Sequence, residues 1–295
     1  VAIAQSGTTE TIGNDVLIGG VGANSWAGLA GDDTYYVDVA GDSITEAVNA
    51  GADSVYSTSA DYTLADNIET LVIWGAGVNG SGNSDVNYLF GNALANTLDG
   101  KGGADGMAGR EGNDTYIVDN IGDTVTENSD QGFDTVNSSV NYTLTANVEV
   151  LTLTGAVGTE ALNGNGNNDN NYLFGNAGNN VLDGKAGADV MVGKAGDDTY
   201  YVDNANDVII ENANDGTDSV ISSVSYGLSA LNPANPTLVA GANAENLTLT
   251  GTALYAFGND LNNTLTGNSN DNVIGGGAGL DTLIGGAGND IYYVD

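Results

Sequence analysis

Aspartate recurs at the sixth position of a nine-residue repeat, G-x-x-G-x-D-x-U-x, in which U is a large apolar residue. Two tandem copies fill residues 184–201, and close copies fill residues 19–36, 100–117 and 276–293. The glycines permit tight turns, and each aspartate offers a hard oxygen ligand where its turn closes. Aspartates repeated in register on stacked turns indicate calcium binding rather than catalysis.

The candidate ligands extend beyond these copies, because degenerate turns continue nearly the same register between them. The predicted calcium ligands are Asp15, Asp33, Asp42, Asp53, Asp105, Asp114, Asp123, Asp134, Asp189, Asp198, Asp207, Asp218, Asp281 and Asp290. Asparagine offers an uncharged carbonyl oxygen, so weaker ligands are predicted at Asn24, Asn87, Asn96, Asn171, Asn180, Asn263 and Asn272. These asparagines are equally compatible with hydrogen-bonded ladders inside the fold. Calcium is expected to bind most tightly at Asp189 and Asp198.

Catalytic chemistry has little support in the sequence. The chain has no histidine and no cysteine, which excludes His-dependent zinc sites, Ser-His-Asp triads and thiol chemistry. It contains neither a G-x-S-x-G elbow nor a phosphate-binding loop. Paired carboxylates of the glycosidase type recur in every period, whereas an active site should be a singular departure. We therefore expect structural acidic residues and no enzyme.

Composition restricts the partners of the chain. Its 295 residues include 39 Asp and Glu but only four Lys and Arg, which gives a net charge of −35. Nucleic acid and anionic membranes would be repelled, so cations are the natural counterpart. No apolar run approaches about 18 residues, so no transmembrane segment is expected.

A long period organises the nine-residue repeats. The block T-Y-[YI]-V-D ends at Asp38, Asp119 and Asp203, and the related I-Y-Y-V-D ends at Asp295. We therefore predict a partial first module at 1–38 and further modules at 39–119, 120–203 and 204–295. The last module carries a loop insertion near 231–244, and all four modules are expected to form one continuous solenoid. The end within a repeat favours a longer protein or an assembly.

The elements that must hold these turns are short strands. Three- to six-residue runs rich in Val, Ile, Leu, Thr and Tyr recur at steps of about nine residues, and no window has the apolar spacing of a helix. This pattern predicts an all-β parallel β-roll or β-solenoid, with about 18 residues in each coil. Aspartates on alternate turns should then stack, as in Asp15 with Asp33, Asp105 with Asp123 and Asp189 with Asp207. Asp114 and Asp198 should likewise face Asp134 and Asp218.

The repeats G-G-A-G-N-D-I-Y-Y (285–293) and G-G-A-G-L-D-T-L-I (276–284) resemble the haemolysin-type, or repeats-in-toxin (RTX), calcium-binding nonapeptide. The long period, with D-T-V-T-E and N-V-E-V-L-T-L-T-G, is similar to superrepeats of large secreted bacterial adhesins and related calcium-binding proteins. The resemblance implies a β-roll with several Ca²⁺ ions, held by turn aspartates and backbone carbonyls. It also implies type I secretion from a Gram-negative bacterium and an extracellular or cell-surface location.

Position two departs from the family pattern, since Lys101, Arg110, Lys185 and Lys194 replace its glycine. These basic residues either neutralise neighbouring acidic turns or contact another acidic chain. Without cations the stacked carboxylates repel, so calcium binding is expected to drive folding.

Two classes of function follow from these observations. The first is a calcium-stiffened structural segment of an adhesin, surface layer or filament, with self-association or continuation into a longer repeat chain. The alternative is an accessory module of a secreted enzyme, which aids export and folding or holds polysaccharide on exposed Tyr and Trp. Trp26 and Trp74 are few for polysaccharide binding, and each is also compatible with a place in the core.

Overall fold

The computed structural model describes residues 2–5, 11–20, 22–155, 158–229 and 243–294. Most of the predicted insertion near 231–244 lies outside these residues. Every regular element within them is a short β-strand, and none is a helix able to span a membrane. The chain divides into two compact units, residues 1–137 and 138–295, and β15 (Thr135–Ser138) contains the point of division.

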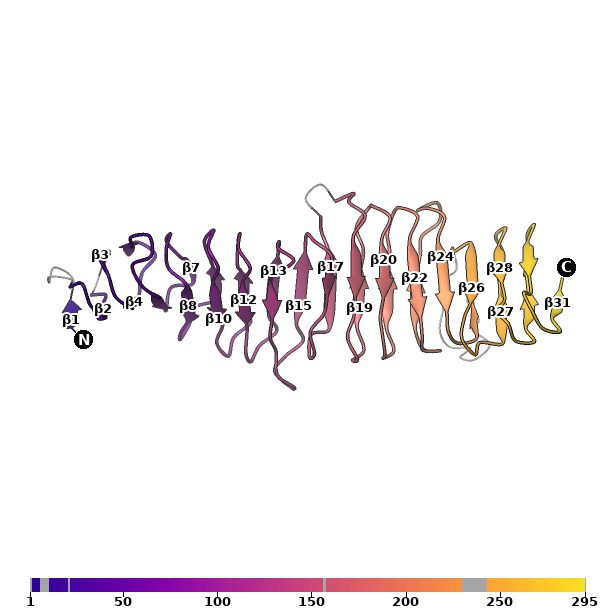
Figure 1. Cartoon of the computed structure of the whole chain (residues 1–295), viewed down its shortest axis with the longest axis horizontal. Helices are drawn as coiled ribbons and strands as arrows, with labels where there is room; N and C mark the ends of the chain where they lie inside the picture. Colours follow the sequence, from indigo (N-terminus) through magenta and orange to yellow (C-terminus); the bar gives the residue numbers. More distant parts are fainter. Residues whose placement is uncertain (1, 6–10, 21, 156–157, 230–242, 295) are drawn as a thin grey trace. The chain divides into compact units, whose positions relative to one another are not determined.

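The first unit winds into parallel strands that stack in chain order (Figure 1). One sheet contains, in order, β1 (Ala2–Gln5), β2 (Asp15–Ile18), β4 (Thr34–Val37), β6 (Ser54–Ser57), β8 (Thr70–Ile73), β10 (Tyr88–Phe90), β12 (Gly106–Ala108) and β14 (Thr124–Val125). The intervening strands pair among themselves: β3 (Ser25–Ala27) with β5 (Ser43–Thr45), and in sequence β7 (Asp61–Thr63), β9 (Asn79–Ser81), β11 (Thr97–Asp99) and β13 (Thr115–Val118).

The second unit repeats this arrangement. One sheet contains β16 (Tyr142–Thr143), β18 (Asn163–Asn165), β20 (Val181–Asp183), β22 (Thr199–Val202), β24 (Ser219–Ser222), β26 (Asn246–Leu249), β28 (Thr264–Thr266) and β30 (Thr282–Ile284). The alternate strands are β17 (Val150–Leu153), β19 (Tyr172–Phe174), β21 (Val190–Val192) and β23 (Val208–Ile210), followed by β25 (Tyr226–Gly227), β27 (Tyr255–Phe257), β29 (Val273–Gly275) and β31 (Ile291–Tyr293).

The strand register confirms the predicted coil. Tyr88 of β10 lies opposite Gly106 of β12, which is 18 residues later, so two nonapeptides make one coil. Thr34 of β4 lies opposite Ser54 of β6, and this pair encloses one of the longer turns. Two strands that pair in parallel with one nonapeptide between them require the chain to wind in successive coils. Each unit is therefore a parallel β-solenoid, as the spacing predicts.

The core is a column of inward-facing side chains. Most strands contribute one or two of them, whereas β31 contributes none. In the first unit Leu71, Leu89 and Met107 occupy successive rungs of one sheet and are almost fully buried. In the second unit Leu182 and Tyr200 do the same. Small strands of alternating burial leave little apolar volume per residue, so the turns must supply much of the remaining stability. Trp26 belongs to this core, whereas Trp74 is 55% exposed.

The predicted module boundaries follow strands of the two units. Asp38 comes directly after β4, Asp119 after β13 and Asp203 after β22. The division into four modules within one continuous solenoid remains a prediction.

Candidate metal centres

The acidic turn residues stack in the pairs that the spacing predicts. The backbone N–H of Asp15 donates to Oδ1 of Asp33 over 2.6 Å, and that of Asp105 donates to Oδ1 of Asp123 over 2.9 Å. In the second unit Asp189 donates in the same way to Asp207, over 3.1 Å. One oxygen of each later aspartate thus accepts from the preceding coil. The second oxygen of Asp123 and that of Asp207 accept N–H groups of their own turns.

The longer turns form the same ladder with a spacing of 20 residues. The backbone N–H groups of Asp33, Asp114 and Asp198 donate to Oδ1 of Asp53, Asp134 and Asp218 over 2.8, 2.8 and 2.9 Å. Asp42 accepts from the N–H of Asn24.

Asp281 and Asp290 also accept from turns 18 residues earlier, but they are only partly buried, whereas the other twelve predicted aspartates are buried.

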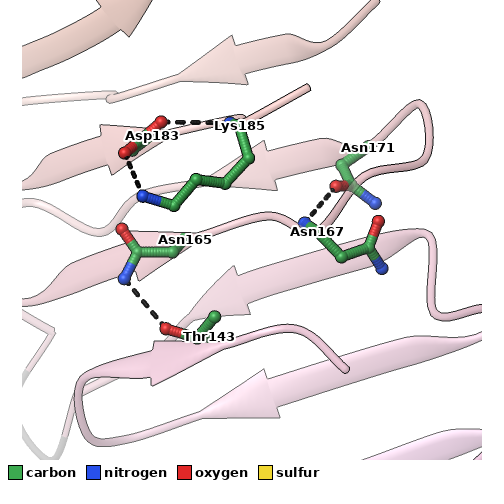
Figure 2. Close-up of polar contacts among 6 residues, drawn as sticks. All are labelled: Thr143, Asn165, Asn167, Asn171, Asp183 and Lys185. Carbon is green, nitrogen blue, oxygen red and sulfur yellow. Dashed lines mark hydrogen bonds and ion pairs between the residues drawn. The ribbon is translucent and has the colours of Figure 1, made fainter. Parts of the chain in front are cut away.

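The asparagine turns are closed by their own amides. In Asn171, Oδ1 accepts the N–H of Asn167 over 2.8 Å, as Figure 2 shows, and Nδ2 donates to the carbonyl of Val148 over 3.1 Å. Asn87 repeats this arrangement with Asn83 and Ile68. The same pair of bonds, one accepted within the turn and one donated to an earlier carbonyl, occurs at Asn96, Asn180, Asn263 and Asn272. The amide therefore donates a hydrogen bond to a backbone carbonyl of an earlier turn. An aspartate in the same place has no donor, and its carboxylate oxygen would face that carbonyl oxygen.

Three buried carboxyl triads stand out among the described residues. They are Asp33–Glu46–Asp53, Asp114–Glu127–Asp134 and Asp198–Glu211–Asp218, and in each the candidate ligand atoms lie within 4.8 Å of one another. Two ligands of one calcium ion can be separated by up to about 5 Å, since each Ca–O bond is about 2.3–2.6 Å long. The spacing of these carboxylates therefore suits a single shared calcium ion.

Each triad includes a glutamate that the nine-residue register does not identify. Glu46, Glu127 and Glu211 follow an aspartate by 13 residues and precede another by seven, so their spacing is constant. The signal was present in D-T-V-T-E, which ends at Glu127, but counting sixth positions selects aspartate and asparagine only. A buried tyrosine, Tyr116 in the second triad, donates its hydroxyl to Oε1 of this glutamate.

Glycine at the first position of the nonapeptide that holds the first aspartate lets the triad oxygens approach the backbone closely. A Cβ placed on Gly28 would contact oxygens of Glu46, Tyr35 and Asp33 more closely than any real Cβ atom can. A Cβ on Gly193 would meet Asp198 and Tyr200 in the same way. The triad oxygens therefore lie directly against this glycine, where an alanine side chain cannot be accommodated.

Burial raises the pKa values of these carboxyl groups in the absence of a cation. Desolvation, together with the charges of Asp134 and Glu127, raises the pKa of Asp114 to about 7, although a hydrogen bond from the N–H of Asn96 lowers it in part. Desolvation likewise raises the pKa of Asp198 to about 7 and that of Glu211 to about 8. In the dyads, burial raises the pKa of Asp105 to about 6. These shifts measure how poorly the turns tolerate uncompensated negative charge.

The metal-free chain should accordingly be more folded at acidic than at neutral pH. A folded-state pKa near 7, above the ordinary aspartate value of about 3.9, means that the folded state binds more protons between these values. The associated stability is complete below about pH 4 and is lost as the pH rises through 7. We expect circular dichroism in chelator to show more β-structure at pH 5 than at pH 8. Equal β-structure at both values would contradict the burial of ionised carboxylates.

The basic residues at position two compensate charge inside the chain. Lys101 lies 2.6 Å from Asp99, and Lys185 lies 2.5 Å from Asp183 (Figure 2). Arg110 donates to the carbonyl of Gly91 and covers the ring of Phe90. All three adopt positive φ, which explains why glycine is usual at this position. Local neutralisation thus accounts for both Lys101 and Lys185.

Comparison with known protein families gives one match, and it falls on these turns. The model of the RTX calcium-binding nonapeptide repeat matches four segments, residues 11–44, 81–116, 165–200 and 257–292. No curated protein matches the chain.

Proposed function

We propose, from the premise that this chain is an RTX calcium-binding repeat protein, that calcium binding at its turns folds and stiffens a structural segment. The predicted aspartates act as ligands in stacked pairs, and the asparagine turns need no ion, because their amides already bridge the coils. Calcium would be the electropositive partner of the oxygens at each aspartate turn, as the amide N–H donor is at each asparagine turn.

One observation carries this proposal: buried carboxylate oxygens without a hydrogen-bond partner. Within the described part of the chain, they include Oδ2 of Asp33, Asp53, Asp105, Asp189 and Asp198. An unpaired buried charge is costly, and a chain of net charge −35 has few internal cations to offset it. A hard divalent cation removes this cost at every turn at once.

The wider role that we propose is that of a secreted protein exported through a type I system from a Gram-negative bacterium. Low cytosolic calcium would keep the chain unfolded for export, and extracellular calcium would fold it at the cell surface. Superrepetition along the chain favours an adhesin, surface layer or filament. Electron microscopy of the calcium-loaded protein should reveal filaments or sheets, and dispersed monomers at all concentrations would contradict self-association.

Ion counting tests the calcium function directly. Equilibrium dialysis at pH 7.5 should give several bound Ca²⁺ per chain, and Mg²⁺ at the same concentration should not replace them. Mg²⁺ holds its waters tightly and demands a regular octahedron, which fixed turn carboxylates do not form. Absence of bound Ca²⁺ at millimolar concentration would overturn the proposal.

A second candidate function, polysaccharide binding, is favoured by one groove in the first unit. Trp74 packs edge-on against Tyr56, which stacks on Tyr36 with ring centroids 5.2 Å apart. Beyond Trp74 opens a groove of about 740 Å³ that Asn92 and Gln131 help to line. Exposed aromatic and amide groups together are suited to sugar rings and hydroxyls.

The tryptophan is also a singular departure from the repeat. Thr154 and Thr250 occupy the same place in the later periods, so packing does not demand a large ring there. We expect Trp74→Ala to weaken retention of the chain in gels containing a neutral polysaccharide several-fold, while Tyr88→Ala, which removes a 52% exposed ring on β10, should not. Equal retention of both variants and the parent would remove this candidate.

A further inference from the structure

A turn of eleven residues closes each of the first three nonapeptide runs, and it does not follow the nonapeptide pattern. Its sequence is E-x-x-[ND]-x-G-x-D-[ST]-V-x and begins at Glu46, Glu127 and Glu211. The segments matched by the RTX repeat end before it, at residues 44, 116 and 200. The glutamate and second aspartate of each triad therefore lie outside the matched repeats.

The three turns share one backbone conformation, although only a few of their residues are identical. The fourth residue has positive φ in all three: 56° at Asn49, 62° at Asp130 and 67° at Asn214. The carbonyl of the fifth residue accepts an N–H from the preceding coil over 2.7 Å in each, as the carbonyl of Asp215 does from Gly196. The glycine at the sixth position packs against that coil too closely for any side chain, as Gly216 does against Gly196. A fixed loop thus brings its glutamate and its aspartate to one place.

That place holds unsatisfied negative charge. Asp198 is 1% exposed and Glu211 6%, and within the described chain Oδ2 of the first and Oε2 of the second have no hydrogen-bond partner. In the first triad the same is true of Oδ2 of Asp33 and Asp53 and of Oε2 of Glu46. These unpartnered oxygens belong to carboxylates within 4.8 Å of one another, and Oδ2 of the first aspartate lies against the first-position glycine, which has no side chain to displace it.

We propose that the eleven-residue turn is a second kind of calcium site, in which one glutamate and two aspartates hold a single ion. The proposal rests on the calcium function proposed above. Three carboxylates contribute three negative charges, whereas the dyads contribute two, and calcium affinity rises with ligand charge and rigidity. The triads, rather than the dyad of Asp189 and Asp207, are then the tightest sites of the chain.

The neighbouring tyrosine makes the glutamate a preorganised ligand. Tyr200 is fully buried and donates its hydroxyl to Oε1 of Glu211, so Oε2 remains for the ion. Asp198 precedes β22, whereas Glu211 and Asp218 belong to the turn that leads to β24, the next strand of the same sheet. One ion would therefore join two successive coils at the end of a nonapeptide run, where the degenerate turns begin. Each such ion would hold two coils together, and one would lie in each of the three repeats of the eleven-residue turn.

Replacing the glutamate by glutamine tests this site while retaining the fold. In Glu211→Gln, Oε1 can still accept from Tyr200, and the amide can donate to the aspartates, as the amide of Asn24 donates to Asp42. We expect Glu46→Gln and Glu211→Gln each to lose one ion from the tightest class in a calcium titration, with an affinity loss at that site on the order of 100-fold. The double variant should lose two. Glu111→Gln, which removes an exposed acid of the first unit, is the matched control and should lose none.

The outcomes separate this inference from the proposed function. If the parent chain binds no calcium, the proposed function fails and the inference fails with it. If the parent binds calcium and both glutamine variants bind as many ions with unchanged affinities, only the inference is overturned. The two variants lie in different units, so a folding defect in one leaves the other as the test, and native mass spectrometry of the folded fraction counts its ions directly.

Discussion

Chelation of calcium at pH 7.5 unfolds this protein, and restoring millimolar calcium refolds it: this is the largest effect that we expect. Two carboxylates about 4 Å apart repel by about 4 kcal/mol at an effective dielectric constant of 20. Several such pairs are buried in each unit, and no strand supplies more than one or two core side chains against this repulsion. Conversely, each ion present at 100 times its dissociation constant stabilises the folded state by about 2.7 kcal/mol.

Circular dichroism and limited proteolysis with and without chelator measure this transition. Magnesium at the same concentration is the control for ionic strength and for divalent charge in general, and it should leave the chain largely unfolded. A β-sheet spectrum that persists in chelator at pH 7.5 would show that the core and the asparagine amides suffice. The calcium-coupled folding proposed for export would then have no basis.

The stacking of the turns was predictable, because in a solenoid residues one coil apart in the sequence lie next to each other in space. Once the coil was counted as two nonapeptides, Asp105 had to lie beneath Asp123, and their backbone-to-carboxylate bond follows. The core positions were predictable for the same reason: Leu182 and Tyr200 are one coil apart and both face inward. Repetition supplies the long-range contacts that are hardest to derive from an ordinary sequence.

The roles of individual side chains were less predictable, since they depend on directions that spacing does not specify. Asn171 and Asp189 occupy the same turn position, yet the amide bridges to Val148, whereas Oδ2 of Asp189 has no partner among the described residues. The sequence does not mark Glu127 as a ligand, because a glutamate that follows a strand is ordinarily solvated. Only its packing beneath Tyr116 turns it toward Asp114. Trp74 was equally ambiguous between core and surface, and the structure places it on the surface.

A single methyl group at Gly109 should disable the second triad, and this is the second large effect that we expect. A Cβ there would overlap Oδ2 of Asp114 and crowd the hydroxyl of Tyr116, and both belong to buried groups held by the coil. Neither can move without leaving its hydrogen bonds, so the methyl must displace the turn or the ion. We expect Gly109→Ala to cost about 3 kcal/mol or more, because it combines overpacking with a lost ligand cluster.

Gly102→Ala is the matched control, since it adds the same methyl in the preceding turn, where the nearest atom to the new Cβ is 4.0 Å away. Its effect on stability should lie within about 0.5 kcal/mol, as for other surface substitutions. Denaturation in urea at saturating calcium gives the stability of both variants, and a calcium titration gives their ion counts. If the two variants prove equally stable and bind equal numbers of ions, the close approach of the triad oxygens to Gly109 is needed for neither stability nor ion binding. If Gly109→Ala loses both stability and one ion while Gly102→Ala loses neither, the first-position glycine is required because only glycine lets the carboxylate oxygens take the positions in which they hold the ion.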